Sequence, residues 1–407
     1  MNVTDFRDRI PAINSWLLAG VFFAIPLTVA PAYWLSALIL ILWLLEGRHA
    51  AKLRALAAEP LVWICVAYYG VFALSLLWTA DLEWGSGMLS RQNFFLLFAL
   101  YFSVARREHF DRYLSAFLLS IALCQILAYY NWVQINFWLD LPEGIRVDKN
   151  PDDTAPFVDR IMYAPVLAMA GYLAGYRLLF QARSRRQRVL YALLFVTTSI
   201  NLVFSGGRAG LVGFLVLVAL LIVQRFARRP VVAAMLAAFM VSGVLLAGYF
   251  GNSYFQGRFN DAVDQVMHYE DRPNSSVGLR IVFAINATRI FLQNPILGVG
   301  LGDYPAEYEK TNALHTPIWK TAWNPHNHYL YVLTATGVLG GSILLPLLLL
   351  PLLRHSPPDG RQFIRYAPPI LIMTISLFES YLMRSNISLM YVAFLAALWC
   401  GIREREA

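Results

Sequence analysis

Hydrophobic residues in this chain occur in long runs, and shorter polar segments that carry most of the charged residues separate these runs. About 20 apolar residues are enough for a helix to cross the hydrocarbon core of a bilayer. The pattern therefore predicts an all-α integral membrane protein with about twelve transmembrane helices in a single polytopic domain over residues 1–407. The predicted spans are 13–29, 31–46, 60–79, 88–105, 112–133, 161–181, 188–204, 209–225, 230–249, 327–353, 364–383 and 386–402.

The composition agrees with a membrane protein. The chain is 58% hydrophobic and 14% charged, whereas a soluble domain carries roughly 25% charged residues. No small-residue cleavage site follows the first apolar run, so we expect a retained helix there and not a signal peptide. The three cysteines, Cys65, Cys124 and Cys400, lie in separate apolar runs. This spacing argues against a disulfide framework and against a structural zinc site.

Basic residues alternate along the chain in a way that predicts its orientation. Counted from a cytoplasmic N-terminus, one set of short loops is strongly basic, around residues 48–54, 106–112, 183–188, 225–229 and 354–365. The positive-inside rule then places both termini in the cytoplasm. The net charge of +8 is mostly a topology signal, so we expect no nucleic-acid partner.

Two loops on the opposite, outer side are long, and cover residues 134–160 and 250–326. The second contains aromatic residues and apolar periodicity that a disordered segment would lack. Its part "SSVGLRIVFAINATRIFLQNP" predicts an amphipathic helix. Ser275 or Ser276 is expected to cap the start of this helix, and Asn294-Pro295 to end it.

The stretch "NPHNHYLYVLTATGVLGG", residues 324–341, places polar residues at the entrance of the tenth span. Polar groups cost free energy to keep dry, so His326 and Asn327 are either a solvated loop end or part of a site. His328 points elsewhere on the helix, and we expect it to be solvated or at an interface. Gly337 and the two following glycines of this segment, Gly340 and Gly341, are expected to let another helix approach closely.

Two arginines share the outer side with His326. Arg208 lies in the turn "FSGGRAG" between two spans, where an arginine is costly unless it is paired or faces a polar cavity. Arg280 follows Ser276 by four residues and shares its helix face, whereas Arg289 lies on the opposite face. A functional role is favoured for Arg208, and a solvated charge is an equal alternative for Arg280.

Weaker candidates also lie on the outer side. In "NPILGVGLGDY", residues 294–304, Gly298, Gly300 and Gly302 offer backbone N–H groups to a phosphate, although a flexible turn explains the same residues. Arg160 and Arg258 are further arginines that can join the group. Guanidinium groups bind phosphate through planar donor forks. Several of them beside one histidine predict an anionic, lipid-linked substrate and a general base.

Glu379 and Arg384 lie near the end of the eleventh span, in "FESYLMRSN". Charges at such positions are functional candidates. Their separation of five residues does not suit an ion pair on a continuous helix. We therefore favour a role in packing and topology for both.

The residues from His326 to Gly340 carry a resemblance to a known family. The chain resembles O-antigen ligases, in a superfamily with O-antigen polymerases and bacterial O-oligosaccharyltransferases. The family signature is H-[NSQ]-x9-G-x-x-G, and here His326-Asn327 is followed by nine residues and then Gly337-Val-Leu-Gly340. The Arg208 turn, the Ser276/Arg280 helix and the glycine turn resemble its weaker landmarks in the same order.

This resemblance implies a fold and an activity. It implies a GT-C-like helical enzyme of lipopolysaccharide biosynthesis in the bacterial inner membrane, with residues 250–326 as a large periplasmic loop. Such a ligase transfers a glycan from undecaprenyl pyrophosphate to a hydroxyl of lipid A–core, in the periplasm. The similar enzymes need neither metal nor cofactor, and we expect none here.

The resemblance also suggests roles for the candidate residues. His326 is the expected general base in an inverting displacement, and Arg208 and Arg280 hold the pyrophosphate. The expected substrate-binding residues are Arg160, Arg258, Asn327, Ser276, Gly300 and Tyr304. The rival functions are O-antigen polymerase, protein O-oligosaccharyltransferase and, in a different class, a transporter of lipid-linked substrate. We find no internal repeat of the kind that many transporters contain.

Overall fold

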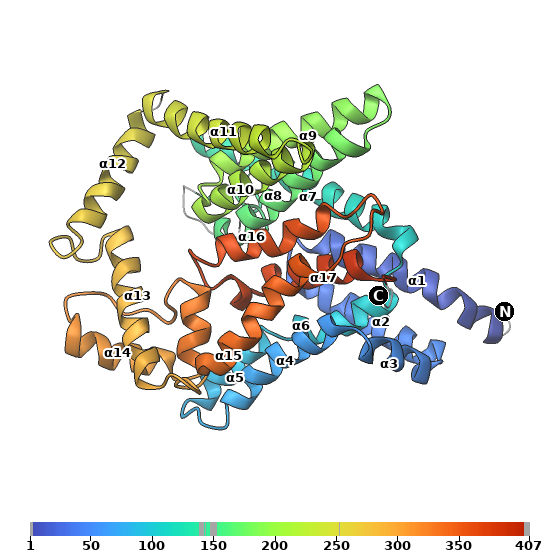
Figure 1. The fold of residues 1–407 in the computed structure, drawn as a ribbon, viewed down its shortest axis with the longest axis horizontal. Coiled ribbons are helices and arrows are strands. Elements are labelled where there is room, and N and C mark those ends of the chain that lie inside the picture. Colours follow the sequence, from blue (N-terminus) through green and yellow to red (C-terminus); the bar gives the residue numbers. More distant parts are fainter. Residues whose placement is uncertain (1–2, 138–141, 143, 147–152, 252, 403–407) are drawn as a thin grey trace.

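The computed structural model describes residues 3–137, 142, 144–146, 153–251 and 253–402. Every regular element within these residues is a helix (Figure 1). The all-α prediction is therefore confirmed for the described part of the chain.

The helices follow one another closely along the chain. The first group is α1 (Val3–Ala24), α2 (Val29–Glu46), α3 (His49–Ala57), α4 (Pro60–Ser75), α5 (Leu82–Ser90), α6 (Phe94–Val104) and α7 (Phe110–Phe137). The second group is α8 (Arg160–Tyr176), α9 (Arg185–Phe204), α10 (Arg208–Arg225), α11 (Pro230–Gly251) and α12 (Ser253–Met267). The third group is α13 (Ser276–Gln293), α14 (Tyr304–His315), α15 (His328–Leu353), α16 (Ala367–Ile375) and α17 (Ser385–Trp399).

Five of the described helices are long and apolar enough to cross a membrane. They are Val29–Glu46, Arg107–Phe137, Arg185–Phe204, Arg208–Arg225 and His328–Leu353. A sixth is counted if α3 and α4, which meet at a bend of 81°, form one span. Each predicted span overlaps a helix, but several helices are short. The membrane character is supported, and the count of about twelve spans stays a prediction.

Two helices form the most deeply buried part of the molecule. In α8 every residue from Tyr163 to Tyr176 is buried, and in α17 every residue from Asn386 to Trp399 is buried. Helix α10 packs closely along α8, because a Cβ on Gly210 would lie 2.4 Å from the carbonyl carbon of Ala164. Helices α12, α13 and α14 lie outside this bundle, along one edge of the molecule (Figure 1). The close contact between Gly210 and Ala164 holds the start of α10 against the start of α8.

Helix α15 is broken at Gly337, which adopts φ 65° and ψ −161°. This left-handed conformation favours glycine. The expectation that Gly337 admits another helix is wrong, since the segment that approaches it is a loop. A Cβ on Gly337 would lie 2.2 Å from the carbonyl oxygen of Ile296.

The loop that follows α13 satisfies the backbone groups that the break in α15 leaves free. The N–H groups of Val299 and Gly300 donate to Thr334 and Ala335 at 2.9 and 3.0 Å, and Val338 donates to Pro295 at 2.8 Å. An apolar helix can break only where such groups find new partners. Residues 294–300 are therefore built into the middle of α15, and they tie α13 to it.

Candidate active site

His326 occupies a strained position immediately before α15. Its φ is 49°, a conformation that few non-glycine residues adopt. Its backbone N–H donates to Asn324 Oδ1 at 2.7 Å, and Asn327 caps α15 by accepting from the N–H of Leu330 at 3.1 Å. Strained residues of this kind cluster at functional sites.

The imidazole of His326 is held by a buried carboxylate. Its Nδ1 lies 2.7 Å from Glu379 Oε2, and its ring stacks on Phe283 of α13 with centroids 5.5 Å apart. The side chain of His326 is 30% exposed and that of Glu379 is 6% exposed. An ionised carboxylate only accepts hydrogen bonds, so Nδ1 carries the proton. In the neutral ring, Nε2 is then left with its lone pair for chemistry.

The carboxyl group of Glu379 is buried, but it lies beside three groups that can stabilise it: His326, Arg384 and the backbone N–H of Ser380. Arg384 Nη2 lies 3.5 Å from Glu379 Oε2, and the Ser380 N–H donates to Oε1 at 2.8 Å.

The expectation that Glu379 and Arg384 are too far apart for an ion pair is wrong. They form an ion pair because the chain between them is not a continuous helix. Helix α16 ends at Ile375, and a short 3-10 turn over Tyr381–Met383 precedes α17. The contact between Glu379 and His326 was not predicted from the sequence. The available signal was the presence of a carboxyl group inside an otherwise apolar segment.

Arg280 lies on the same side of α13 as the ring that contacts His326. It is three residues before Phe283, and residues at that spacing share a helix face. Its Nη1 donates to Ser276 Oγ and to the Ser276 carbonyl oxygen, each at 3.1 Å. The expected shared face of Ser276 and Arg280 is confirmed. Ser275 is the N-cap of α13, with its Oγ accepting from the N–H of Gly278 at 3.2 Å.

The elements that carry the predicted arginines pack against the helices that flank the His326–Glu379 pair. Helix α13, which carries Arg280, packs against α15, and α8, which begins at Arg160, packs against α16 and α17.

Arg160 and the turn that carries Arg208 are in direct contact. Arg160 is the first residue of α8, and its Nη1 lies 3.6 Å from where a Cβ on Gly206 would stand. A Cβ on Gly207 would lie 2.8 Å from the Arg160 carbonyl oxygen. Arg208 follows at once as the first residue of α10. The structure therefore brings Arg160 and the Arg208 turn together.

The glycine turn does not offer a phosphate cradle. Its N–H groups donate within the protein: Gly298 to Asn294, Gly300 to Ala335 and Gly302 to Thr79 Oγ1 at 3.4 Å. Tyr304 is fully buried against the ring of Tyr308. The Gly300 N–H and the Tyr304 ring thus have partners within the protein, and their substrate-binding roles stay predictions.

The remaining candidates have different outcomes. Asn327 Nδ2 donates to the Leu377 carbonyl oxygen at 3.3 Å, which ties the start of α15 to the segment leading to Glu379. The expectation for His328 is wrong, because this residue is fully buried and its Nε2 lies 2.8 Å from the Tyr68 hydroxyl. Arg258 lies on α12, and its side chain is outside the described part of the structure.

No group of three or more His, Cys, Asp or Glu side chains among the described residues is placed to hold a metal ion. The charged groups around His326 are arginines and single carboxylates. Metal-independent chemistry stays a prediction.

Comparison with known protein families finds a match for the central part of the chain. A search of curated proteins found no match. Residues 193–345 match the family model described as O-antigen ligase. This segment contains Arg208, Arg280 and the whole stretch from His326 to Gly340, whereas Arg160 and Glu379 lie outside it. The match over residues 193–345 supports a relation of this chain to the O-antigen ligase family.

Proposed function

We propose that this protein is an O-antigen ligase, which transfers a glycan from undecaprenyl pyrophosphate to a hydroxyl of lipid A–core. The observation that carries the proposal is the pairing of His326 Nδ1 with the buried carboxyl group of Glu379. This pairing leaves Nε2 of a partly exposed histidine available as a base, beside a group of arginines. The family domain supports the same class of chemistry.

The proposed reaction is a single displacement with inversion. Nε2 of His326 accepts the proton of the acceptor hydroxyl as the oxygen attacks the anomeric carbon of the donor. The bond between that carbon and the pyrophosphate oxygen breaks, and the pyrophosphate leaves with the electron pair. Glu379 stabilises the positive charge that His326 gains, as a buried carboxylate does beside other catalytic histidines.

The arginines in this proposal neutralise the leaving group. The pyrophosphate gains negative charge as the bond breaks, and positioned guanidinium groups stabilise that charge in the transition state. In this proposal Arg280 reaches the donor from α13, and Arg208 and Arg160 reach it from the paired starts of α10 and α8. We propose that these groups hold the donor on the periplasmic side of the inner membrane, without a metal ion. Arg258 stays a predicted member of this group.

O-antigen polymerase is the second candidate, because the matched family supports both ligases and polymerases. A polymerase uses the same donor, but its acceptor is a growing lipid-linked glycan. The same site chemistry serves both reactions, so only the acceptor separates them.

The test uses purified protein, undecaprenyl-pyrophosphate-linked glycan and rough lipopolysaccharide, with EDTA present. We expect a ligated lipopolysaccharide band with the wild type and its loss with His326→Ala. His315→Ala is the matched control, because His315 is an exposed histidine at the end of α14. Chain growth on the lipid-linked donor alone identifies a polymerase. A band of full intensity with His326→Ala refutes the base assignment, and loss of the band with EDTA refutes metal independence.

A further inference from the structure

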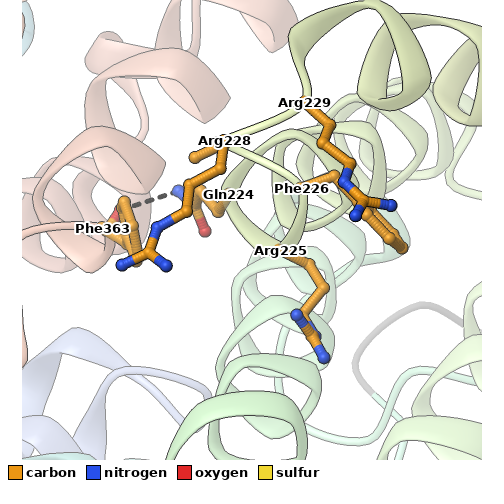
Figure 2. Close-up of a pocket in the computed structure, with 7 residues that line it drawn as sticks. Gln224, Arg225, Phe226, Arg228, Arg229 and Phe363 are labelled. Carbon is orange, nitrogen blue, oxygen red and sulfur yellow. Dashed lines mark hydrogen bonds between the residues drawn. The ribbon is translucent and has the colours of Figure 1, made fainter.

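A basic pocket lies at the end of α10 that is remote from Arg208. It has a volume of about 450 Å³ and lies where α10 turns into α11. Figure 2 shows three arginine side chains that line it, with Arg228 beside Phe363 and with Arg225 and Arg229 directed away from Phe363. Its lining residues are Gln224, Arg225, Phe226, Ala227, Arg228, Arg229 and Phe363. We call it the α10–α11 pocket.

Hydrogen bonds fix one wall of this pocket. Gln224 is buried, and its Nε2 donates to the Phe363 carbonyl oxygen at 3.0 Å (Figure 2). The Tyr172 hydroxyl, from the buried helix α8, donates to Gln224 Oε1 at 3.0 Å. The wall therefore belongs to the rigid bundle, and only the arginines are free to adjust to a ligand.

The arginines of the pocket are exposed and uncompensated. Arg225, Arg228 and Arg229 form no ion pair with any acidic side chain that the structure describes. Three guanidinium groups around one cavity favour an anion, and their planar donor forks suit phosphate oxygens.

The position of the pocket favours a lipid over a free anion. Helix α10 has 18 residues and is apolar enough to span a membrane, which corresponds to about 27 Å. Arg208 and the pocket are at its opposite ends, so the pocket lies at a membrane boundary if α10 spans. Immediately after Arg229, α11 exposes a continuous set of large apolar side chains. They are Val231, Val232, Met235, Leu236 and Phe239.

We propose that the α10–α11 pocket binds an anionic phospholipid of the membrane leaflet remote from the active site. The phosphate lies among Arg225, Arg228 and Arg229, and the acyl chains lie along the exposed apolar side chains of α11. Basic pockets between membrane helices bind anionic headgroups in this way. Each arginine near an anionic lipid contributes a factor of about five in affinity, so the three together contribute roughly 10²-fold.

The test measures binding of dioleoyl phosphatidylglycerol to the purified protein in detergent by native mass spectrometry. Dioleoyl phosphatidylcholine is the reference lipid, and inorganic phosphate and glycerol phosphate are the competitors without acyl chains. The test variant is Arg225→Gln/Arg228→Gln/Arg229→Gln. The control is Arg185→Gln/Arg186→Gln/Arg188→Gln at the start of α9. The turn at 205–207 joins α9 and α10, so both triplets lie at the same end of this hairpin.

We expect the wild type to prefer phosphatidylglycerol, the pocket variant to weaken this binding by roughly 10²-fold and the control to weaken it by less than about fivefold. If the triple variant does not fold, Arg228→Gln alone is expected to weaken binding about fivefold. Equal weakening by both triplets would overturn the proposal, because charge alone would then explain binding. Competition by inorganic phosphate at the affinity of the lipid would also overturn it, since the site would then take free anions.

Discussion

Replacement of Glu379 by glutamine tests the proposed base most directly. Glutamine keeps an oxygen that accepts from Nδ1 of His326, so the 2.7 Å contact is retained and only the charge is removed. A hydrogen bond to a charged group contributes about 1.5–3 kcal/mol. The imidazolium that forms in the transition state loses this stabilisation, so kcat is expected to fall by about 10- to 10²-fold. This loss is smaller than the roughly 10²- to 10⁴-fold loss expected for His326→Ala.

The assay measures initial rates of glycan transfer while the concentration of lipid-linked donor is varied. The KM for the donor is expected to change by less than about twofold, because Glu379 acts through His326 and not on the pyrophosphate. Glu307→Gln is the matched control, since Glu307 also forms an ion pair, with Lys310 at 2.6 Å, but lies on α14. A thermal unfolding curve for each variant separates loss of rate from loss of fold.

Two results would refute this reasoning. An unchanged kcat in a folded Glu379→Gln protein means that the carboxylate does not stabilise a charged His326. A raised donor KM with kcat intact means that Glu379 organises donor binding and that the base role belongs elsewhere.

Two further predictions follow from the same geometry. Arg280→Gln is expected to raise the donor KM and to lower kcat, and Arg280→Lys is expected to restore both in part. The control Arg289→Gln changes an arginine on the opposite face of α13 and is expected to leave the kinetics of transfer near wild type. Gly337→Ala is expected to lower the free energy of unfolding by at least about 1–3 kcal/mol, because the φ of Gly337 is 65° and an added Cβ would collide with Ile296. The control is Gly243→Ala, where an added Cβ meets nothing within 4 Å. This control is expected to be neutral or stabilising in the same thermal melt.

The apolar pattern predicted the helices well because a helix that lies in lipid needs a long run of apolar residues, which is easy to recognise in a sequence. Helix α13 was predicted nearly to its ends, since Ser275 and Asn294 are strong capping and stop signals. A break inside an apolar segment does not interrupt the run of apolar residues, so the sequence does not reveal it. The break after Ile375 brings Glu379 to Arg384, and the break at Gly337 admits residues 294–300, yet both segments have the hydropathy of continuous helices.

The candidate site was predictable where one short segment carries its chemistry. His326 and Asn327 mark the entrance of α15, and Arg280 shares a helix with its capping serine. Glu379 is 53 residues from His326 in sequence, and no helical periodicity relates them. The phosphate-binding role of the glycine turn was predicted from local sequence alone, without knowledge of its tertiary contacts. Its N–H groups look available in a sequence, but whether they bind a ligand or the backbone of α15 depends on tertiary contacts.

The spacing between His326 and Gly337 has a physical reason in this structure. Nine residues separate Asn327 from Gly337, and they form the first part of α15, about 14 Å of helix. His326 stacks on α13 through Phe283 at one end of this segment, and the loop that leaves α13 enters the break at Gly337 at the other end. Helix α13, which carries Arg280, is therefore attached to α15 at two points. An insertion or deletion between His326 and Gly337 rotates and shifts one attachment relative to the other, so the histidine and the arginine lose their common position even if each helix still forms.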